Sequence, residues 1–476
     1  MTGCNWFEIS NEGWRRLNAG RPLGALMREA VQNAFDAAAK NVRVDVDEST
    51  IVIEDDSPNG FDDERLVYTV FLTDKADAPT QRGRKGRGLK ELISAARTAV
   101  VESVGVTVSF DRDGRRSAVN KRRKGTRLTL QRRNVRREID AALAFLALVV
   151  PPRGVRFQVN SQQIPRPRTF QTIGPYYLQT VVIRDGIERL VERPSTLHLL
   201  HPRDSGEPPH IYEMGIPIQP IGLPWHVDIE QRVPLAAGRD RIDEYYRLTV
   251  YTSIFEELVP RRLPKNELQS DWVMEVLGQC DVSDAALHHY VRRSLPARAV
   301  LSGSKQADDR ARQAGMEVVS TRSMARGVLQ ALGRVVPTSD AYVNARLEAE
   351  REPVEPTDQQ QLALELYEHL AQRLLGRSVR VRLMRKPANL EGYVDDGLFD
   401  RRRGELWLNI LGSVDLTRPL SADSLTVVLH ELAHNDSEAH DERFIRALDT
   451  LAGRAAELLL REGGAFASWW EDKVPG

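Results

Sequence analysis

Three of the ten histidines of this 476-residue chain lie within eleven residues, in the segment HELAHNDSEAH that begins at His430. His430 and His434 are four residues apart, so on a helix they lie on one face and can bind one metal ion. Glu431 lies beside them, where a carboxylate can take a proton from a metal-bound water. Catalytic zinc sites use three protein ligands, and His440 can supply the third. HExxH also occurs by chance on helices with surface histidines, but the third histidine favours a catalytic zinc site.

The elements around these histidines are predicted from apolar spacing. Leu425, Val428, Leu429 and Leu432 recur at helical spacing and predict a helix packed on a core. A second helix is expected at 359–376, and strands at 379–383 and 404–410.

With Asp441 and Phe444, the histidines resemble the HExxH-x5-HxxxF pattern of small gluzincin-like metallopeptidases of the SprT and YgjP type. The resemblance covers about residues 356–476. It implies a minimal zincin domain that hydrolyses peptides, with the strand at 404–410 able to align an extended peptide substrate.

A second group of chemically capable residues lies near the other end of the chain. Glu29, Asn33 and Asp36 are spaced i, i+4 and i+7, so they form one polar stripe on the helix predicted for 26–37. A buried polar stripe is costly unless it is satisfied, so the stripe indicates a ligand or an ion. A GxxGxG loop at 83–88 then enters a helix, and such a loop offers backbone N–H groups to phosphate.

These pieces are connected by predicted strands at 42–46 and 51–53, a polar loop at 54–61, and a strand that follows Lys124-Gly125-Thr126. An ordinary α/β domain with a polar helix is the alternative, since each pattern is weak alone. In this order they resemble the ATP-binding Bergerat fold of the GHKL superfamily, which includes gyrase-type topoisomerases, ninety-kilodalton heat-shock chaperones, histidine kinases and MutL. The resemblance covers about residues 10–133.

The GHKL resemblance implies a role for each matching residue. Glu29 corresponds to the general base that activates water, and Asn33 to the magnesium ligand. The usual Asp-x-Gly-x-Gly motif is altered here, so either Asp55 or Asp56 could read adenine, and strand alternation through Ile53 favours Asp55. The remaining residues expected at the ATP site are Asp36, Gly60, Lys75, Gly83, Lys85, Gly86, Gly88 and Thr126.

The length predicts about three domains, and the predicted elements and the two resemblances imply mixed α/β and α+β classes. We expect a GHKL α/β sandwich at 1–150, a transducer-like α+β domain at 151–264, a small α/β domain at 265–347, a linker at 348–358 and the zincin-like domain at 359–476. In GHKL topoisomerases and MutL the transducer domain sends a basic side chain to the γ-phosphate, and here Arg239 or Arg241 resembles that residue.

Charge and targeting signals limit the possible partners. The 67 basic residues balance the 67 acidic ones, which argues against a protein that coats DNA, although residues 112–137 are locally basic. Two cysteines are too few for a disulfide framework. Neither an apolar signal segment at the start nor an apolar run long enough to span a bilayer is present, so we expect a cytoplasmic protein without membrane contact.

The sequence therefore predicts an ATP-regulated zinc metallopeptidase that uses ATP, Mg²⁺ and Zn²⁺ and acts on a protein or peptide. The resemblance to GHKL proteins makes a homodimer through the ATP domain plausible, and a switch joined to a destructive hydrolase would suit bacterial stress or phage defence. One alternative is an ATP-driven chaperone or clamp whose zinc domain only binds a partner. Another is a nucleic-acid-associated ATPase that uses the basic segment 112–137.

Overall fold

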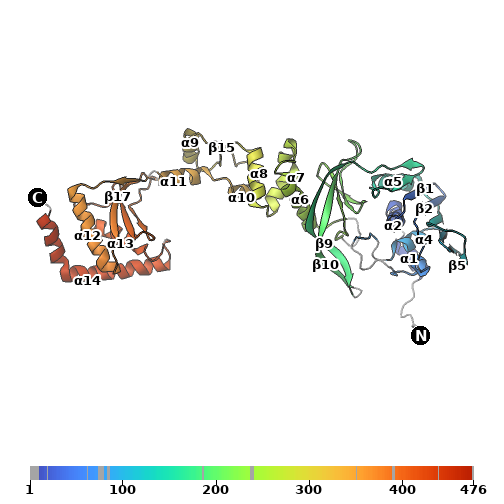
Figure 1. The fold of residues 1–476 in the computed structure, drawn as a ribbon, viewed down its shortest axis with the longest axis horizontal. Coiled ribbons are helices and arrows are strands. Elements are labelled where there is room, and N and C mark those ends of the chain that lie inside the picture. The colour runs from blue at the N-terminus through green and yellow to red at the C-terminus, as the bar shows by residue number, and fades with distance from the viewer. Residues whose placement is uncertain are drawn as a thin grey trace, which may run out of the picture. The chain divides into compact units, whose positions relative to one another are not determined.

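The structure is a computed structural model, and it describes residues 10–18, 20–61, 63–72, 80–82, 86–184, 187–235, 241–349, 351–388, 392–437 and 439–473. The chain divides into two compact units, Met1–Ala286 and Leu287–Gly476. Figure 1 shows the helices and strands of both units. None of the described helices combines the length and the apolar character needed to cross a membrane.

The first unit begins with an eight-stranded sheet in the order β5-β4-β3-β6-β2-β1-β7-β8. Its strands are β1 (Asn41–Val46), β2 (Thr50–Asp55), β3 (Thr98–Ser103), β4 (Val106–Asp111), β5 (Gly114–Val119), β6 (Arg127–Gln131), β7 (Arg156–Val159) and β8 (Gln162–Gln163). The sequence patterns at 42–46 and 51–53 predicted β1 and β2, because alternate residues such as Val44 and Ile53 are buried.

Helices pack on one face of this sheet, where they enclose the core (Figure 1). They are α1 (Asn11–Asn18), α2 (Leu23–Asp36), α3 (Arg65–Tyr68), α4 (Gly88–Ser94) and α5 (Arg136–Leu148). The core side of α2 carries Met27, Val31 and Phe35, while its polar stripe turns to another side of the helix.

The expected division at residue 150 differs from the observed sheet. Strand β7 lies beyond residue 150, yet it pairs in parallel with β1 as part of the first sheet. Phe157 explains this placement, because it is fully buried and its ring contacts Phe35 of α2 edge-on at 5.7 Å.

The second sheet of the first unit has the order β12-β11-β13-β10-β9. Its strands are β9 (Thr169–Arg184), β10 (Ile187–Leu200), β11 (His210–Glu213), β12 (Ile216–Pro220) and β13 (His226–Ile229). The following helices are α6 (Glu244–Leu258), the 3-10 helix η1 (Lys265–Gln269) and α7 (Asp271–Gln279). Trp272 of α7 packs edge-on against Tyr251 and Phe255 of α6, so the first unit continues past the expected boundary at 264.

The second unit begins within α8 (Asp284–Ser294) and first forms a small α/β unit. Here β14 (Ala299–Leu301) and β15 (Glu317–Val319) pair in parallel, and α9 (Lys305–Gln313) joins them. Two further helices follow, α10 (Arg326–Gly333) and α11 (Ser339–Ala349).

The last part of the chain is a four-stranded sheet in the order β16-β17-β19-β18 with three helices. The elements are β16 (Glu352–Val354), α12 (Asp358–Leu375), β17 (Arg380–Arg385), β18 (Gly397–Asp400), β19 (Glu405–Asn409), α13 (Ala422–Ala433) and α14 (Glu442–Lys473). Residues 352–354 were expected to belong to a linker, but they pair with β17 as an edge strand. This pairing satisfies backbone groups that an extended linker would leave to water.

Candidate functional site

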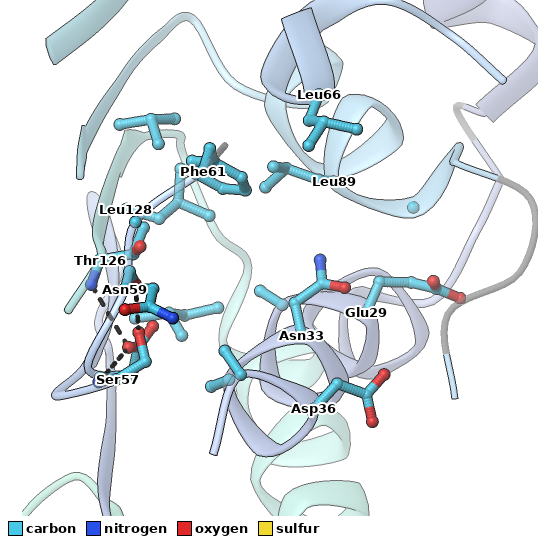
Figure 2. Close-up of a pocket in the computed structure, with 18 of the residues that line it drawn as sticks. Glu29, Asn33, Asp36, Ser57, Asn59, Phe61, Leu66, Leu89, Thr126 and Leu128 are labelled. Atoms are coloured by element: carbon cyan, nitrogen blue, oxygen red, sulfur yellow. Dashed lines mark hydrogen bonds between the residues drawn. The ribbon is translucent and has the colours of Figure 1, made fainter. Parts of the chain in front are cut away.

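A cavity of about 500 Å³ opens between α2, the loop after β2 and the start of α4. Figure 2 shows Asn33 pointing from α2 into this space, with Phe61 and Leu89 on other walls. The cavity thus brings together segments that are far apart in the sequence. The predicted site residues that line it are Glu29, Asn33, Asp36, Asp55, Gly60, Gly86, Gly88 and Thr126.

Glu29 lies in a crowded position at the α4 end of the cavity. It is only 8% exposed, and its carboxylate lies 3.6 Å from the Arg28 guanidinium. A Cβ atom on Gly88 would lie 2.1 Å from Cγ of Glu29. Position 88 therefore requires glycine because the Glu29 side chain occupies the space that any other side chain would need.

Asp36 lines the cavity, but its carboxylate is engaged elsewhere. It accepts hydrogen bonds from Nη1 of Arg82 at 2.7 Å and from the Arg82 backbone N–H at 3.0 Å. The Asp36 side chain is 1% exposed, and in Figure 2 it turns away from Asn33. Arg82 also donates from Nε to the carbonyl oxygen of Met214 in the second sheet domain. Asp36 is therefore the ion-pair partner of Arg82, and Arg82 joins this part of the ATP-site helix to the second sheet.

The two candidate adenine readers occupy different environments. Asp55 lines the cavity, and its Oδ1 accepts from the backbone N–H groups of Ser57 at 2.8 Å and Thr126 at 3.3 Å. The carboxylate of Asp56 instead accepts three hydrogen bonds of 2.8 Å, from the backbone N–H groups of Lys40 and Asn41 and from the Asn41 side chain. Burial raises the pKa of Asp56, but these hydrogen bonds outweigh it and hold that pKa below its usual value. The geometry favours Asp55 as the residue that faces a ligand.

The two residues that precede β6 support the Asp55 side of the cavity. Gly125 has φ +72°, and a Cβ atom there would meet the carbonyl oxygen of Asp55 at 2.0 Å. The hydroxyl of the next residue, Thr126, lies 3.1 Å from the hydroxyl of Ser103. The close approach of the two strands is therefore possible only with glycine at position 125.

Some expected residues cannot be placed. Lys75, Gly83, Lys85 and Arg239 lie outside the described residues. Arg241 is described, but it is exposed and does not line the cavity.

The apolar and small polar walls of the cavity were not predicted from the sequence. Phe61, Leu66, Leu72, Val101 and Leu128 come from five separate segments. The available signal was weak, because an apolar residue that faces a ligand has the same periodicity as one that faces a core. Ser57 and Asn59 also line the cavity.

The three histidines of the second predicted site come together as expected. The potential ligand atoms of His430, His434 and His440 all lie within 4.8 Å of one another, and Nε2 of His440 is 3.1 Å from Nε2 of His430. Nδ1 of His434 donates to the carbonyl oxygen of Ser437 at 2.9 Å, which leaves its Nε2 as an acceptor. Burial and the charges of the other two histidines lower the pKa of His430, although Asp396 acts in the opposite sense. A neutral imidazole is the form that binds metal.

Glu431 is buried beside this cluster, on the side that faces β18. Burial raises its pKa to about 7, with smaller contributions from the negative charges of Asp395 and Asp396. A Cβ atom on Gly397 would lie 2.8 Å from Cγ of Glu431 and 3.0 Å from the carbonyl oxygen of Trp407. Glycine at the start of β18 thus allows the strand to lie directly against Glu431.

Asp395 and Asp396 were not predicted as part of this site. The buried side chain of Asn409 holds their loop, because its Nδ2 donates to the carbonyl oxygens of Lys386 and Asp395 at 2.9 and 2.8 Å. Lys386 also pairs with Asp395 at 2.6 Å. Since these residues are about 35 positions from His430 in the sequence, no local spacing could have indicated them.

The expectation that the strand at 404–410 aligns a peptide is wrong for the observed sheet. That strand is β19, and both of its edges are occupied, by β17 on one side and β18 on the other. A strand without a free edge cannot pair with an added peptide.

The basic segment 112–137 is partly neutralised within the fold. Arg122 pairs with Glu54, Arg116 with Asp111, and Arg132 with Glu138. The guanidinium of Arg115 lies 3.5 Å from the ring centre of Tyr68. These contacts leave less unpaired charge for nucleic acid than the sequence alone suggests.

Comparisons with known proteins bear on the nucleotide cavity. The family model described as "Histidine kinase-, DNA gyrase B-, and HSP90-like ATPase" matches residues 23–140. No curated protein matches the chain.

Solved structures with similarity to the chain include the ATPase region of Saccharomyces cerevisiae topoisomerase II, at 12% identity and a TM-score of 0.30. That alignment covers 41% of this chain and 62% of the yeast chain, which is less than two thirds. Another is the ATPase and transducer domains of DNA topoisomerase II from Balamuthia mandrillaris, at 13% identity, a TM-score of 0.33, and coverage of 57% and 82%.

Both TM-scores are low, so the domain assignment rests on the family model together with the residues that line the cavity. The match ends well before the histidine cluster, whose function stays a prediction. The GHKL resemblance is confirmed for the N-terminal part of the chain. Residues 23–140 form an ATPase domain of the histidine kinase, DNA gyrase B and HSP90 type.

Proposed function

We propose that this protein is a zinc metallopeptidase whose activity is regulated by ATP bound in the N-terminal domain. The observation that carries the peptidase half is the convergence of three histidine side chains beside the buried carboxylate of Glu431. The ATPase domain supplies the regulatory half. A homodimer through the ATPase domain, and a role in bacterial stress or phage defence, belong to the same proposal.

The histidine cluster has the donor chemistry that zinc requires. His430, His434 and His440 each offer one imidazole nitrogen, and imidazole is a common zinc ligand. The hydrogen bond from His434 to the Ser437 carbonyl fixes the tautomer of that ring, as outer partners of zinc-binding histidines usually do. A bound zinc ion would supply Lewis acidity and would lower the pKa of a coordinated water.

The protein's own residues then act on the proton and on the substrate. Glu431 can hold a proton, because burial raises its pKa to about 7, close to the range in which a general base works well. Its Cγ would lie 2.8 Å from a Cβ atom on Gly397, so the side chain packs against the edge strand β18. We therefore assign proton transfer during peptide hydrolysis to Glu431.

In the ATPase domain we assign roles by the positions of side chains in the cavity. Glu29 is the base that activates water, Asn33 binds magnesium, and Asp55 accepts a hydrogen bond from the adenine amino group. Thr126 supports Asp55 through its backbone N–H, and Gly86 and Gly88 belong to the phosphate loop. Arg239 or Arg241 would contact the γ-phosphate, by their resemblance to the basic residue of GHKL transducer domains.

The test uses the full-length protein with zinc, with and without ATP. Peptide cleavage, including self-cleavage, is read by mass spectrometry, and phosphate release is read in parallel. Glu431→Gln should keep its zinc and lose cleavage, whereas Glu29→Ala should keep ATP binding and lose about 100-fold or more in phosphate release. Cleavage by the ATP-bound Glu29→Ala protein should differ from that of the nucleotide-free protein by about 5- to 150-fold, the usual range of coupling between sites.

Each half of the proposal can fail separately. Cleavage by Glu431→Gln at the parent rate would remove the peptidase assignment, and phosphate release by Glu29→Ala at the parent rate would remove the assigned base. Equal cleavage with and without ATP would leave two independent activities on one chain. Glu457→Gln, which changes an exposed glutamate on α14, is the matched control and should behave as the parent.

A further inference from the structure

A second large cavity lies in the first unit, and none of its residues lines the nucleotide cavity. It is an open cleft of about 690 Å³. Its walls come from the segment that follows α5, from the residues just before the phosphate loop, and from strands of the second sheet. The cleft therefore lies where the ATPase domain and the second sheet meet.

More of the ionisable side chains in this cleft are basic than acidic. Several of these side chains already have a partner. Arg82 is paired with Asp36 at 2.7 Å. Nε2 of His198 lies 2.5 Å from the carboxylate of Glu230, and its Nδ1 lies 3.0 Å from the hydroxyl of Thr172. Arg82 and Glu230 thus each already have a side-chain partner.

Two guanidinium groups remain without a matching carboxylate partner in the part of the chain that the structure describes. Nη1 of Arg166 donates to the carbonyl oxygen of Pro151 at 2.7 Å, which does not neutralise its charge. Arg153 is exposed and forms no ion pair with a residue that the structure describes. Burial lowers the pKa of Arg166, the charge of Asp228 opposes this, and the like charge of Arg153 adds to it. An arginine nevertheless stays protonated in proteins.

The nearest carboxyl group does not remove this excess of positive charge. Asp228 is 5% exposed and accepts a hydrogen bond from the Gly215 N–H at 2.6 Å. Burial is the main cause of a raised pKa at Asp228, which favours its neutral form. Bringing Arg153 and Arg166 together in a half-buried cleft is unfavourable unless an anion joins them.

We propose that this cleft binds a phosphorylated small molecule, with its phosphate held by Arg153 and Arg166. A guanidinium group matches two phosphate oxygens at once, so the two arginines can hold a doubly charged group. Val150, Pro152 and Met214 supply apolar wall for the organic part of the molecule. The volume of the cleft lies within the range of about 300–1,000 Å³ that is usual for small-molecule sites.

The nucleotide of the ATPase domain does not account for this site. The nucleotide cavity is lined by different residues and has its own phosphate loop. The cleft nevertheless adjoins the ATPase machinery, because Arg82 lines the cleft while its partner Asp36 lines the nucleotide cavity. Arg82 is therefore a poor choice for a test, and Arg153 and Arg166 are better ones.

The test measures binding of ribose 5-phosphate to the full-length protein by ³¹P NMR, with saturating Mg-ADP to fill the nucleotide cavity. Ribose, added in excess, serves as the uncharged competitor and should not displace ribose 5-phosphate. The parent should bind ribose 5-phosphate, and the double variant Arg153→Ala/Arg166→Ala should bind it at least about tenfold more weakly, since it loses the charged hydrogen bonds to the phosphate. Arg189→Ala/Arg193→Ala removes the same charge from exposed positions of β10 and should bind like the parent.

Three results would overturn the site. These are no binding of ribose 5-phosphate by the parent, equal binding by the Arg153/Arg166 variant, or an equal loss in both double variants, which would indicate unspecific charge attraction. Unchanged Mg-ADP affinity shows that the double variant is folded. If it does not fold, Arg153→Ala alone changes only an exposed side chain and should still weaken binding several-fold.

Discussion

The nucleotide cavity and the histidine cluster are built in opposite ways. The cavity takes its polar groups from α2, the loop after β2, the start of α4 and the residue just before β6, so that residues about 100 positions apart share one space. The histidine cluster takes its three imidazoles from eleven consecutive residues at the end of α13 and in the turn that follows. One site depends on the packing of the whole domain, and the other depends mainly on a helix and its turn.

This difference decides which residues are sensitive in each site. In the distributed cavity, glycines allow the close approach of separate segments, as at Gly88 against Glu29 and at Gly125 against the Asp55 carbonyl. In the local cluster, the residues whose substitution should matter most are the three histidines. The tertiary structure contributes Asp395 and Asp396 to the surroundings of Glu431 rather than to the histidine set.

The largest effect is expected from removing one histidine of the local cluster. His434→Ala should lower zinc content from about one ion per chain to none, because three protein ligands are the minimum of an open catalytic site. Elemental analysis of the purified protein measures this. His288→Ala changes an exposed histidine outside the cluster and should keep its zinc. Full zinc in the His434 variant would show that the cluster is not a metal site.

The next effect tests the packing of the distributed cavity. Gly88→Ala places a methyl group where the Glu29 side chain lies, with 2.1 Å to its Cγ, so Glu29 must move. Phosphate release should fall by about 100-fold, which is what loss of a general base usually costs. Gly20→Ala is the matched control, because a Cβ atom there meets nothing within 4 Å. Parent-like hydrolysis by Gly88→Ala would mean that Glu29 is not fixed by this contact.

A smaller effect should separate the two neighbouring aspartates. Asp55→Ala should weaken ATP binding by about 10- to 100-fold, because a hydrogen bond to a charged group contributes about 1.5–3 kcal/mol. Asp56→Ala should leave ATP binding unchanged and lower the free energy of unfolding by about 1 kcal/mol, through the loss of its hydrogen bonds to Lys40 and Asn41. Calorimetric titration and denaturant unfolding measure the two quantities. The reverse pattern would make Asp56 the adenine reader.

The smallest effect is a pH dependence that belongs to Asp56. Its folded-state pKa is lowered, so its stabilising contribution is complete above its unfolded pKa of about 3.9 and is lost as pH falls through the lower folded value. The difference in unfolding free energy between the parent and Asp56→Ala should therefore be full at pH 6 and should shrink below about pH 4. A difference that stays constant down to pH 2 would contradict the assigned hydrogen bonds.

Features that depend on local spacing could be predicted from the sequence. Histidines at i and i+4 necessarily share a helix face, and the stripe of Glu29 and Asn33 faces one side of α2 for the same reason. Alternation fixed β1 and β2, and the order of the motifs indicated the ATPase domain that the family model confirms.

Which partner each polar side chain meets depends on contacts between distant segments of the chain. The same helical stripe that exposes Asn33 to the cavity brings Asp36 to Arg82, a residue 46 positions away. Asp56 is drawn to the backbone of Lys40 and Asn41 across the β1–β2 pair, and β18 rather than β19 takes the sheet edge beside Glu431. Hydrogen bonds and strand pairing between distant segments set these outcomes, and no pattern within a short stretch of sequence records which distant partner a side chain will meet.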